Sequence, residues 1–108
     1  MDLNKISMIA LKNAEKRVKN GAKISTETES MLKHTSTEVV EAMEAYTKLM
    51  WNENRSPVCL QADFTSELAD IICCVLIIAA KEELDIEKAV FDCIKKNERR
   101  ANGIGDKL

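Results

Sequence analysis

The chain of 108 residues contains little that would interrupt a helix: one proline, three glycines and only 4% aromatic residues. Proline and glycine are the strongest breakers of helices, and β-rich proteins need frequent turns, so their scarcity favours an all-α fold. The length suits about one domain. We expect a single all-α domain over residues 1–108, with its core at about 26–101 and a flexible tail at 102–108.

The sequence also lacks a long apolar segment and an excess of positive charge. Its longest apolar run, Ile71–Ala80, is far shorter than the roughly 20 residues that span a bilayer, and its N-terminal residues have no hydrophobic signal stretch. Asp and Glu outnumber Lys and Arg by 18 to 16, and only KKNERR at 95–100 is locally basic. A patch that small suits a phosphate ligand better than a duplex. We therefore expect a cytoplasmic protein with neither a membrane nor a nucleic-acid partner.

Metal sites built from histidine or cysteine are not expected either. His34 is the only histidine, and the four cysteines have no Cys-x-x-Cys or Cys/His spacing. We expect the cysteines to be small buried hydrophobic side chains in a reducing compartment. A di-iron carboxylate bundle is nearly excluded, because it needs two Glu-x-x-His motifs.

The breakers that are present divide the chain into four predicted helices. The first ends at Asn20-Gly21, a helix stop signal, and the last is capped by Asp85. The loop between the second and third helices is expected at 52–63, around the only proline. The predicted helices cover about 3–19, from among Ser25, Thr26 and Thr28 to about Trp51, from near Asp63 or Thr65 to about Glu83, and from Asp85 through KKNERR.

The third predicted helix has no polar face after residue 70. From Ile71 it is apolar all round, so it must be covered on every side. Three other short helices can hardly do this alone. We therefore expect part of this helix to face a second subunit, in a homodimer or a homotetramer.

Four carboxylates form two matching pairs. Glu67 and Asp70 are three residues apart in the third helix, and Glu38 and Glu41 are three apart in the second, one turn after His34. Side chains at this spacing project side by side. Two carboxylates about 5 Å apart repel by about 3 kcal/mol at an effective dielectric near 20, so four in one cleft call for a cation. Oxygen ligands without cysteine select Mg²⁺, with Mn²⁺ as the alternative.

These pairs resemble the motif of the MazG-like, all-α nucleoside triphosphate pyrophosphohydrolases, in which ExxE is followed by ExxD on a third helix. Here EVVE occupies 38–41 and ELAD follows at 67–70 after about 25 residues. The resemblance continues in ELDIEKAV and in KKNERR, where Asn97 and Arg100 are three apart, and His34 stands where many members have a histidine. It covers about residues 31–101, with a looser likeness upstream in NAEKRVKNG at 13–21.

The resemblance implies a four-helix core with a carboxylate-lined metal site. It also implies Mg²⁺-dependent hydrolysis of a ribo- or deoxyribonucleoside triphosphate between the α and β phosphates, giving the monophosphate and pyrophosphate. It assigns the metal to Glu38, Glu41, Glu67 and Asp70, the catalytic base to either Glu38 or Glu41, and substrate binding to His34, Lys96, Asn97 and Arg100.

Two other functions stay open at this point. Phosphoribosyl-ATP pyrophosphohydrolase uses similar carboxylates, and a non-catalytic helical interaction module could carry acidic pairs as a solvated face. The base and sugar of a substrate also stay open. Ala22 stands where relatives have an aromatic residue, and Trp51 could contact the base or pack into the core or a subunit interface.

Overall fold

A computed structural model describes residues 2–51 and 57–103. Over these ranges the chain forms helices and no strand, which confirms the all-α prediction: the helices are α1 (Leu3–Lys19), α2 (Thr28–Trp51), α3 (Pro57–Lys81) and α4 (Ile86–Ala101). In this part of the chain no helix combines the length and the apolar character needed to cross a bilayer. Of the predicted tail, residues 104–108 lie outside the described residues.

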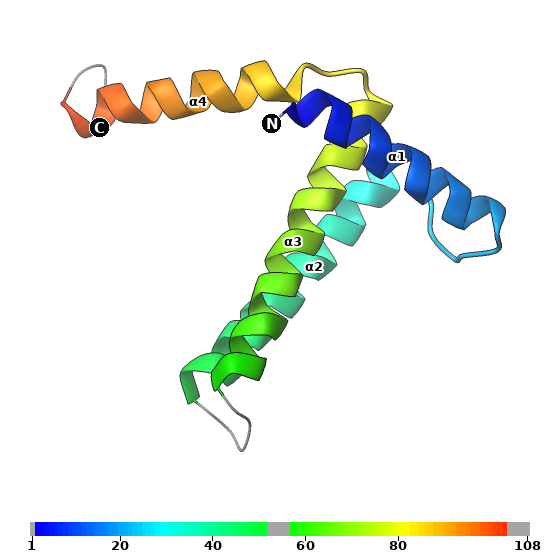
Figure 1. Ribbon diagram of the computed structural model, residues 1–108, viewed down its shortest axis with the longest axis horizontal. Helices are drawn as coiled ribbons and strands as arrows, with labels where there is room; N and C mark the ends of the chain where they lie inside the picture. Colours follow the sequence, from blue (N-terminus) through cyan, green and yellow to red (C-terminus); the bar gives the residue numbers. More distant parts are fainter. Residues whose placement is uncertain (1, 52–56, 104–108) are drawn as a thin grey trace.

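The two longest helices, α2 and α3, pack against each other. α2 and α3 run antiparallel and pack side by side, and we call this pair the hairpin (Figure 1). α1 packs across α3 at the end of the hairpin where α3 finishes, and α4 leads away from the hairpin in another direction (Figure 1). The hairpin and α1 therefore form the body of the chain.

The ends of α1 and the start of α4 follow from local hydrogen bonds. The carboxylates of Asp2 and Asp85 accept hydrogen bonds from backbone N–H groups in the first turns of α1 and α4, as helix N-caps do. α1 ends where Gly21 adopts a φ of 91°, and the N–H of Ala22 donates to the carbonyl of Arg17 at 2.9 Å. A residue with positive φ closes a helix end in this way, and glycine adopts that φ without strain.

The start of α3 was wrongly predicted. A loop was expected to extend to residue 63, but the helix begins at Pro57. Proline suits the first turn of a helix, because its missing N–H would have no helical partner there and its φ is already helical. The proline therefore starts this helix instead of belonging to a loop. Residues 52–56 lie outside the described residues.

The core lies where α1 crosses the hairpin and between α2 and α3. The buried Ser7 on α1 donates its hydroxyl to the carbonyl of Leu76 on α3. Farther along the hairpin, the rings of Tyr46 and Phe64 lie 5.4 Å apart. The buried hydrophobic residues are Leu11, Ala14, Met31, Ala42, Leu60, Cys74, Leu76, Ala79 and Ala80.

α4 does not join this core. None of its residues is buried. It is attached near its start, where the N–H of Leu3 donates to the Glu87 carboxylate at 2.8 Å and the Asn4 amide donates to Asp85 at 2.9 Å. The core of one chain is therefore built by α1, α2 and α3, and not by four helices as predicted.

The hairpin exposes a broad apolar surface on one side. One chain does not cover the apolar third helix on every side, since Ile72 on α3 is 59% exposed. The exposed hydrophobic residues share one side of α2 and one side of α3 at helical spacing. This apolar hairpin face consists of Leu32, Val39, Val40, Met43, Tyr46 and Met50 on α2, and Leu68, Ile72 and Val75 on α3.

Candidate metal and substrate site

Three of the four predicted carboxylates converge on the side of the hairpin opposite the apolar hairpin face. Glu38 on α2 faces Glu67 and Asp70 on α3, and one oxygen of each lies within 4.8 Å of the others. Oxygens that share an octahedral Mg²⁺ at about 2.1 Å lie about 3 to 4 Å apart. The three side chains therefore need only small rotations to hold one such ion together.

Two of these carboxylates have oxygens without a partner. Oε2 of Glu38 and Oε2 of Glu67 are buried and accept no hydrogen bond, and Glu38 as a whole is only 9% exposed. A buried polar atom without a partner is costly, and natural proteins keep few of them. A cation would satisfy both oxygens at once, so the residues present fit a hard divalent metal.

The electrostatics of the cluster agree with its geometry. Burial raises the pKa of Glu38, the charges of Glu41 and Asp70 raise that pKa further, and His34 opposes them. The pKa of Glu67 is also raised, first by desolvation and then by the charges of Glu41 and Asp70. Each carboxylate thus makes ionisation of its neighbours less favourable, and a bound cation would reverse this effect.

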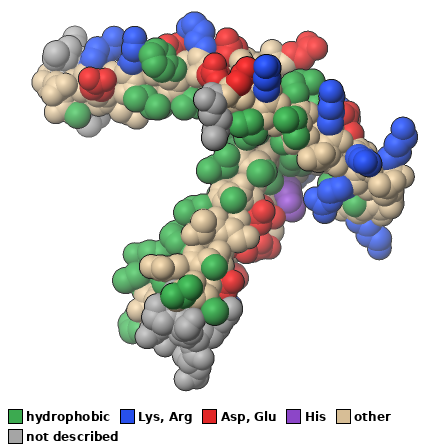
Figure 2. Space-filling view, in the orientation of Figure 1, with side chains coloured by type: hydrophobic (Ala, Val, Ile, Leu, Met, Phe, Trp, Pro, Cys, Tyr) green, Lys and Arg blue, Asp and Glu red, His purple; other side chains and the backbone are tan. Residues whose placement is uncertain are grey.

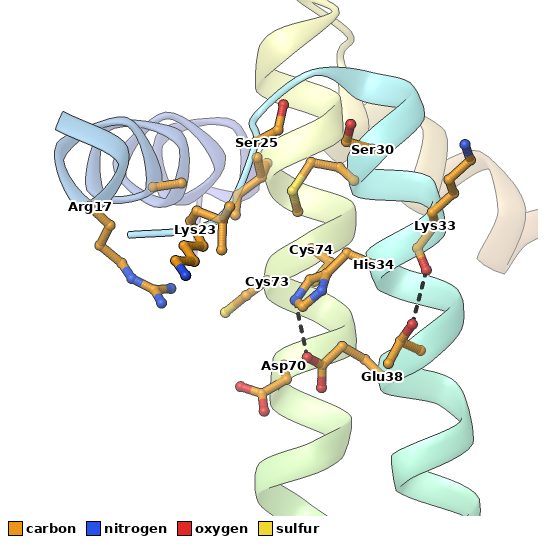
Figure 3. Close-up of a pocket in the computed structure, with 15 residues that line it drawn as sticks. Arg17, Lys23, Ser25, Ser30, Lys33, His34, Glu38, Asp70, Cys73 and Cys74 are labelled. Atoms are coloured by element: carbon orange, nitrogen blue, oxygen red, sulfur yellow. Dashed lines mark hydrogen bonds and ion pairs between the residues drawn. The ribbon is translucent and has the colours of Figure 1, made fainter. Parts of the chain in front are cut away.

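His34 and Glu41 flank the group of three. The Nε2 atom of His34 lies 3.1 Å from Oε1 of Glu38, one helical turn away (Figure 3). Glu41 is exposed and stands outside the group, yet it acts electrostatically on both Glu38 and Glu67. With Glu67 it lines a smaller cavity of about 240 Å³.

Cations from α1 and the following loop line a cavity that also contains Glu38, with a volume of about 670 Å³. Figure 3 shows Arg17, from the last turn of α1, and Lys23, from the loop after it, on the opposite side of this cavity from Glu38. Asp70 also lines it. Lys33 lines the cavity too, but its amine points away from it (Figure 3) and pairs with Glu29 at 3.6 Å.

Sequence reasoning did not select Arg17 or Lys23. Both lie in an unremarkable basic segment, KRVKNGAK, on either side of the Asn20-Gly21 helix stop. These two cations face carboxylates that come later in the chain. They do so only because α1 ends sharply and crosses the hairpin. Two signals were available: the helix stop in a basic segment, and the looser family likeness of NAEKRVKNG, which contains Arg17.

The model of the MazG nucleotide pyrophosphohydrolase domain matches residues 26–104, well over half of the chain. The chain belongs to this family. No curated protein and no solved structure is similar enough to the chain to count as a match. The matched range includes every site residue that the resemblance assigned, but it begins after α1, so Arg17 and Lys23 lie outside it.

The basic residues of α4 are not brought to this site by their own chain. Lys96, Asn97 and Arg100 are exposed, and none of them lines the cavity that Glu38 and Asp70 share with Arg17. Asn97 makes a local contact within α4: its amide lies 3.8 Å from Sγ of Cys93, one turn earlier. Three of the predicted substrate-binding residues are thus separated from the predicted metal ligands.

Trp51 does not pack into the core. It is 74% exposed at the end of α2. It follows Glu38 by 13 residues, or about 20 Å along the helix. Trp51 therefore lies well away from the carboxylates. The prediction that it could pack into the core is wrong for this chain.

The cysteines are mostly exposed, not buried. Cys74 is buried, whereas Cys59, Cys73 and Cys93 are exposed. Burial raises the pKa of the Cys74 thiol, which favours its protonated form although it lines the cavity. The expectation of four buried cysteines is wrong for three of them: Cys73 lines the open cavity, and Cys59 and Cys93 are exposed on α3 and α4.

Proposed function

We propose that this MazG domain hydrolyses a nucleoside triphosphate between its α and β phosphates, with Mg²⁺, to give the nucleoside monophosphate and pyrophosphate. One observation carries the proposal: a single cavity has negative side chains on one side, Glu38 and Asp70, and positive side chains on the other, Arg17 and Lys23. A magnesium triphosphate complements both sides, because its cation suits the carboxylates and its negatively charged phosphates suit the arginine and the lysine. The volume of about 670 Å³ lies within the range of about 300–1,000 Å³ that is usual for small-molecule sites.

Glu38, Glu67 and Asp70 are the proposed metal ligands, because their oxygens already converge and two of these oxygens lack other partners. A bound Mg²⁺ would supply neutralisation of phosphate charge and a lower pKa for a coordinated water. His34 holds Oε1 of Glu38, and this contact would leave Oε2 of Glu38 for the metal.

Glu41 is the proposed general base. The sequence left the choice between Glu38 and Glu41 open, and Glu41 is the one that stands outside the convergent group while acting on it electrostatically. A carboxylate free of metal can accept the proton of the attacking water. The water oxygen would then bond to phosphorus as the bond between the α and β phosphates breaks, and pyrophosphate would leave with the electron pair.

Arg17 and Lys23 are the proposed phosphate ligands in the same chain. A guanidinium donates two parallel hydrogen bonds to phosphate oxygens, whereas a lysine amine acts as a compact point charge. Both side chains lie across the cavity from Glu38 (Figure 3), so phosphates that extended from the carboxylates across this cavity would meet them.

A pyrophosphate-release screen tests this proposal. All common ribo- and deoxyribonucleoside triphosphates are assayed with Mg²⁺, beside phosphoribosyl-ATP. We expect at least one nucleoside triphosphate to give monophosphate and pyrophosphate in equal amounts. Release of single phosphate would contradict cleavage at this bond, and turnover of phosphoribosyl-ATP alone would assign that substrate instead. Absence of calorimetric Mg²⁺ binding at millimolar metal, with and without nucleotide, would favour an interaction module.

A further inference from the structure

Cys73 places a thiol in the cavity that the carboxylates line. Its side chain is exposed and points into this cavity (Figure 3). Cys74 lines the cavity too, but it is buried, and burial raises the pKa of its thiol. Cys59 and Cys93 are exposed, and neither lines the cavity. Cys73 is therefore the one cysteine that offers an accessible sulfur to a ligand at this site. Such a sulfur stands out among the exposed and hydrophobic side chains that cover the rest of the molecule (Figure 2).

Cys73 and Asp70 form a pair of neighbouring side chains on α3. They stand three residues apart in DIIC at 70–73, and helical side chains at this spacing have Cβ atoms about 5–6 Å apart. An ion bound by both would hold a carboxylate oxygen at about 2.1 Å and a thiolate sulfur at about 2.3 Å, which fits this separation. Both side chains are exposed and can therefore turn toward a common ion.

Glu38 supplies a third ligand from the facing helix α2. It lines the same cavity although it is only 9% exposed, and its buried Oε2 accepts no hydrogen bond. An unpartnered buried oxygen of this kind is an independent sign of a cation site. His34 lies 3.1 Å from Oε1 of the same carboxylate, and partners of this kind orient metal ligands. The spacing of the cysteines gave no sign of this set, because its members come from two helices.

The thiol changes which cation the carboxylates prefer. Glu38, Glu67 and Asp70, whose ligand atoms already converge, offer only oxygen, and this suits Mg²⁺. A set in which the Cys73 thiolate takes the place of Glu67 offers sulfur and oxygen, with a fourth position for water. Zn²⁺ favours such tetrahedral sites, and thiolates select it over Mg²⁺. Because Glu38 and Asp70 belong to both sets, an ion in one set removes ligands from the other.

We propose that Glu38, Asp70 and Cys73 form a second metal site, which binds a thiophilic divalent cation, Zn²⁺, in place of Mg²⁺. Cys73 loses its thiol proton to solvent and coordinates the ion as a thiolate. The bound ion takes two of the proposed Mg²⁺ ligands and occupies the cavity that phosphates would cross toward Arg17 and Lys23, so it inhibits hydrolysis until a chelator removes it. The inhibition rests on the proposed function, whereas the binding of Zn²⁺ does not.

Cobalt binding tests the site without any need for activity. Co²⁺ is titrated into the metal-free parent and into Cys73→Ser, Cys93→Ser and Asp70→Asn, each checked for folding by circular dichroism. The parent and Cys93→Ser should show a near-ultraviolet charge-transfer band from sulfur to cobalt, and Zn²⁺ should abolish it. Cys73→Ser should lack the band, and Asp70→Asn should need about 10-fold more Co²⁺ or higher to reach half of it. No band in the parent, or the same titration in all four proteins, would overturn the inference.

Zinc titration of pyrophosphate release tests the inhibition. Release is measured at a fixed Mg²⁺ concentration, and each protein is compared with its own activity before Zn²⁺ is added. The Zn²⁺ concentration for half inhibition should rise by about 10-fold or more in Cys73→Ser and stay unchanged in Cys93→Ser. EDTA followed by fresh Mg²⁺ should restore the parent. Equal inhibition of the parent and Cys73→Ser would overturn the inhibitory role of this site.

Thiol alkylation separates a failure of this inference from a failure of the proposed function. Inactivity of the parent toward every nucleotide would refute the proposed function, and the cobalt band and alkylation would then decide the site. Zn²⁺ should slow the reaction of Cys73 with iodoacetamide and leave that of Cys93 unchanged, as measured by mass spectrometry of the peptides that carry them. Equal protection of both cysteines, or protection of neither, would overturn the inference.

Discussion

At the scale of single residues, the cluster of carboxylates destabilises the protein when no cation is bound. Glu38 and Glu67 each keep a buried oxygen without a partner, and burial together with neighbouring charge raises the pKa of both. A raised pKa means that the folded state prefers the neutral acid. The stabilising contribution of these groups is therefore complete at acid pH, and it is lost as the pH rises through their folded pKa values.

Glu67→Gln should raise the melting temperature of the metal-free protein at neutral pH, because it removes this charge while keeping the shape. The gain should disappear as the pH falls below the ordinary carboxyl pKa of 4.5, where Glu67 is neutral in both states. Added Mg²⁺ should stabilise the parent by RT ln(1 + [Mg²⁺]/Kd) and the variant much less. Thermal unfolding from pH 4 to 8, with EDTA or with Mg²⁺, measures all three effects. A metal-free variant that melts below the parent at pH 7 would show that the fold needs this carboxylate as a hydrogen-bond acceptor.

Glu41→Gln should separate metal binding from catalysis. If Glu41 accepts the proton, the variant should keep most of the thermal stabilisation by Mg²⁺ while kcat falls by about 10²-fold or more. Glu44→Gln is the matched control one turn later, on the same smaller cavity, and its kcat should be unchanged. Loss of the Mg²⁺ effect in Glu41→Gln would instead make Glu41 a metal ligand.

At the scale of elements, α1 adds positive charge to a cavity that the hairpin lines with carboxylates. The buried hydroxyl of Ser7 on α1 donates a hydrogen bond to α3, and α1 ends at the turn of Gly21. This placement brings Arg17 and Lys23 to the cavity, although both lie outside the residues that match the family model. The same element thus serves the fold and the proposed substrate site.

Arg17→Ala should raise the KM for the triphosphate by about 10-fold or more, because a charge-assisted hydrogen bond to phosphate contributes about 1.5–3 kcal/mol. Lys16→Ala removes a neighbouring cation that does not line the cavity, and its KM should match that of the parent. Steady-state kinetics over a range of nucleotide concentrations gives both values. An equal change of KM in the two variants would mean that α1 attracts the nucleotide only through its overall positive charge, without a specific contact from Arg17.

At the scale of the whole molecule, one chain is too extended to bury its apolar side chains by itself. Its hairpin exposes apolar side chains on the side away from the carboxylates, and α4 adds another exposed apolar row. Contiguous apolar surface of this extent marks an interaction site in soluble proteins. The expected second subunit would cover it.

Ile72→Asp should therefore lower the mass of the native protein toward the 12.1 kDa of one chain. A charge placed in the apolar hairpin face would have to be buried without a partner in the assembly. Ile9→Asp is the matched control, since Ile9 is 58% exposed on α1, outside this face. Sedimentation velocity at micromolar concentration should show the assembled mass for Ile9→Asp and the parent. Equal masses for both variants would exclude the hairpin face as the interface.

The sequence by itself determined the features that depend on neighbouring residues. α1 occupies the predicted range, Asp85 caps α4, and Asn20-Gly21 ends α1, because capping and turn formation involve groups only a few residues apart. The i,i+3 spacing also predicted which carboxylates share a side of each helix. The motif they form led to the family.

Tertiary structure alone decided which groups meet across helices. The convergence of Glu38 with Glu67 and Asp70 depends on how α2 packs against α3, and the presence of Arg17 beside them depends on the angle at which α1 crosses the hairpin. The separation of Arg100 from these carboxylates follows from the direction that α4 takes after Asp85. Such contacts join residues far apart in the chain, and their geometry is selected by the burial of side chains over the whole molecule, which no local pattern of residues records.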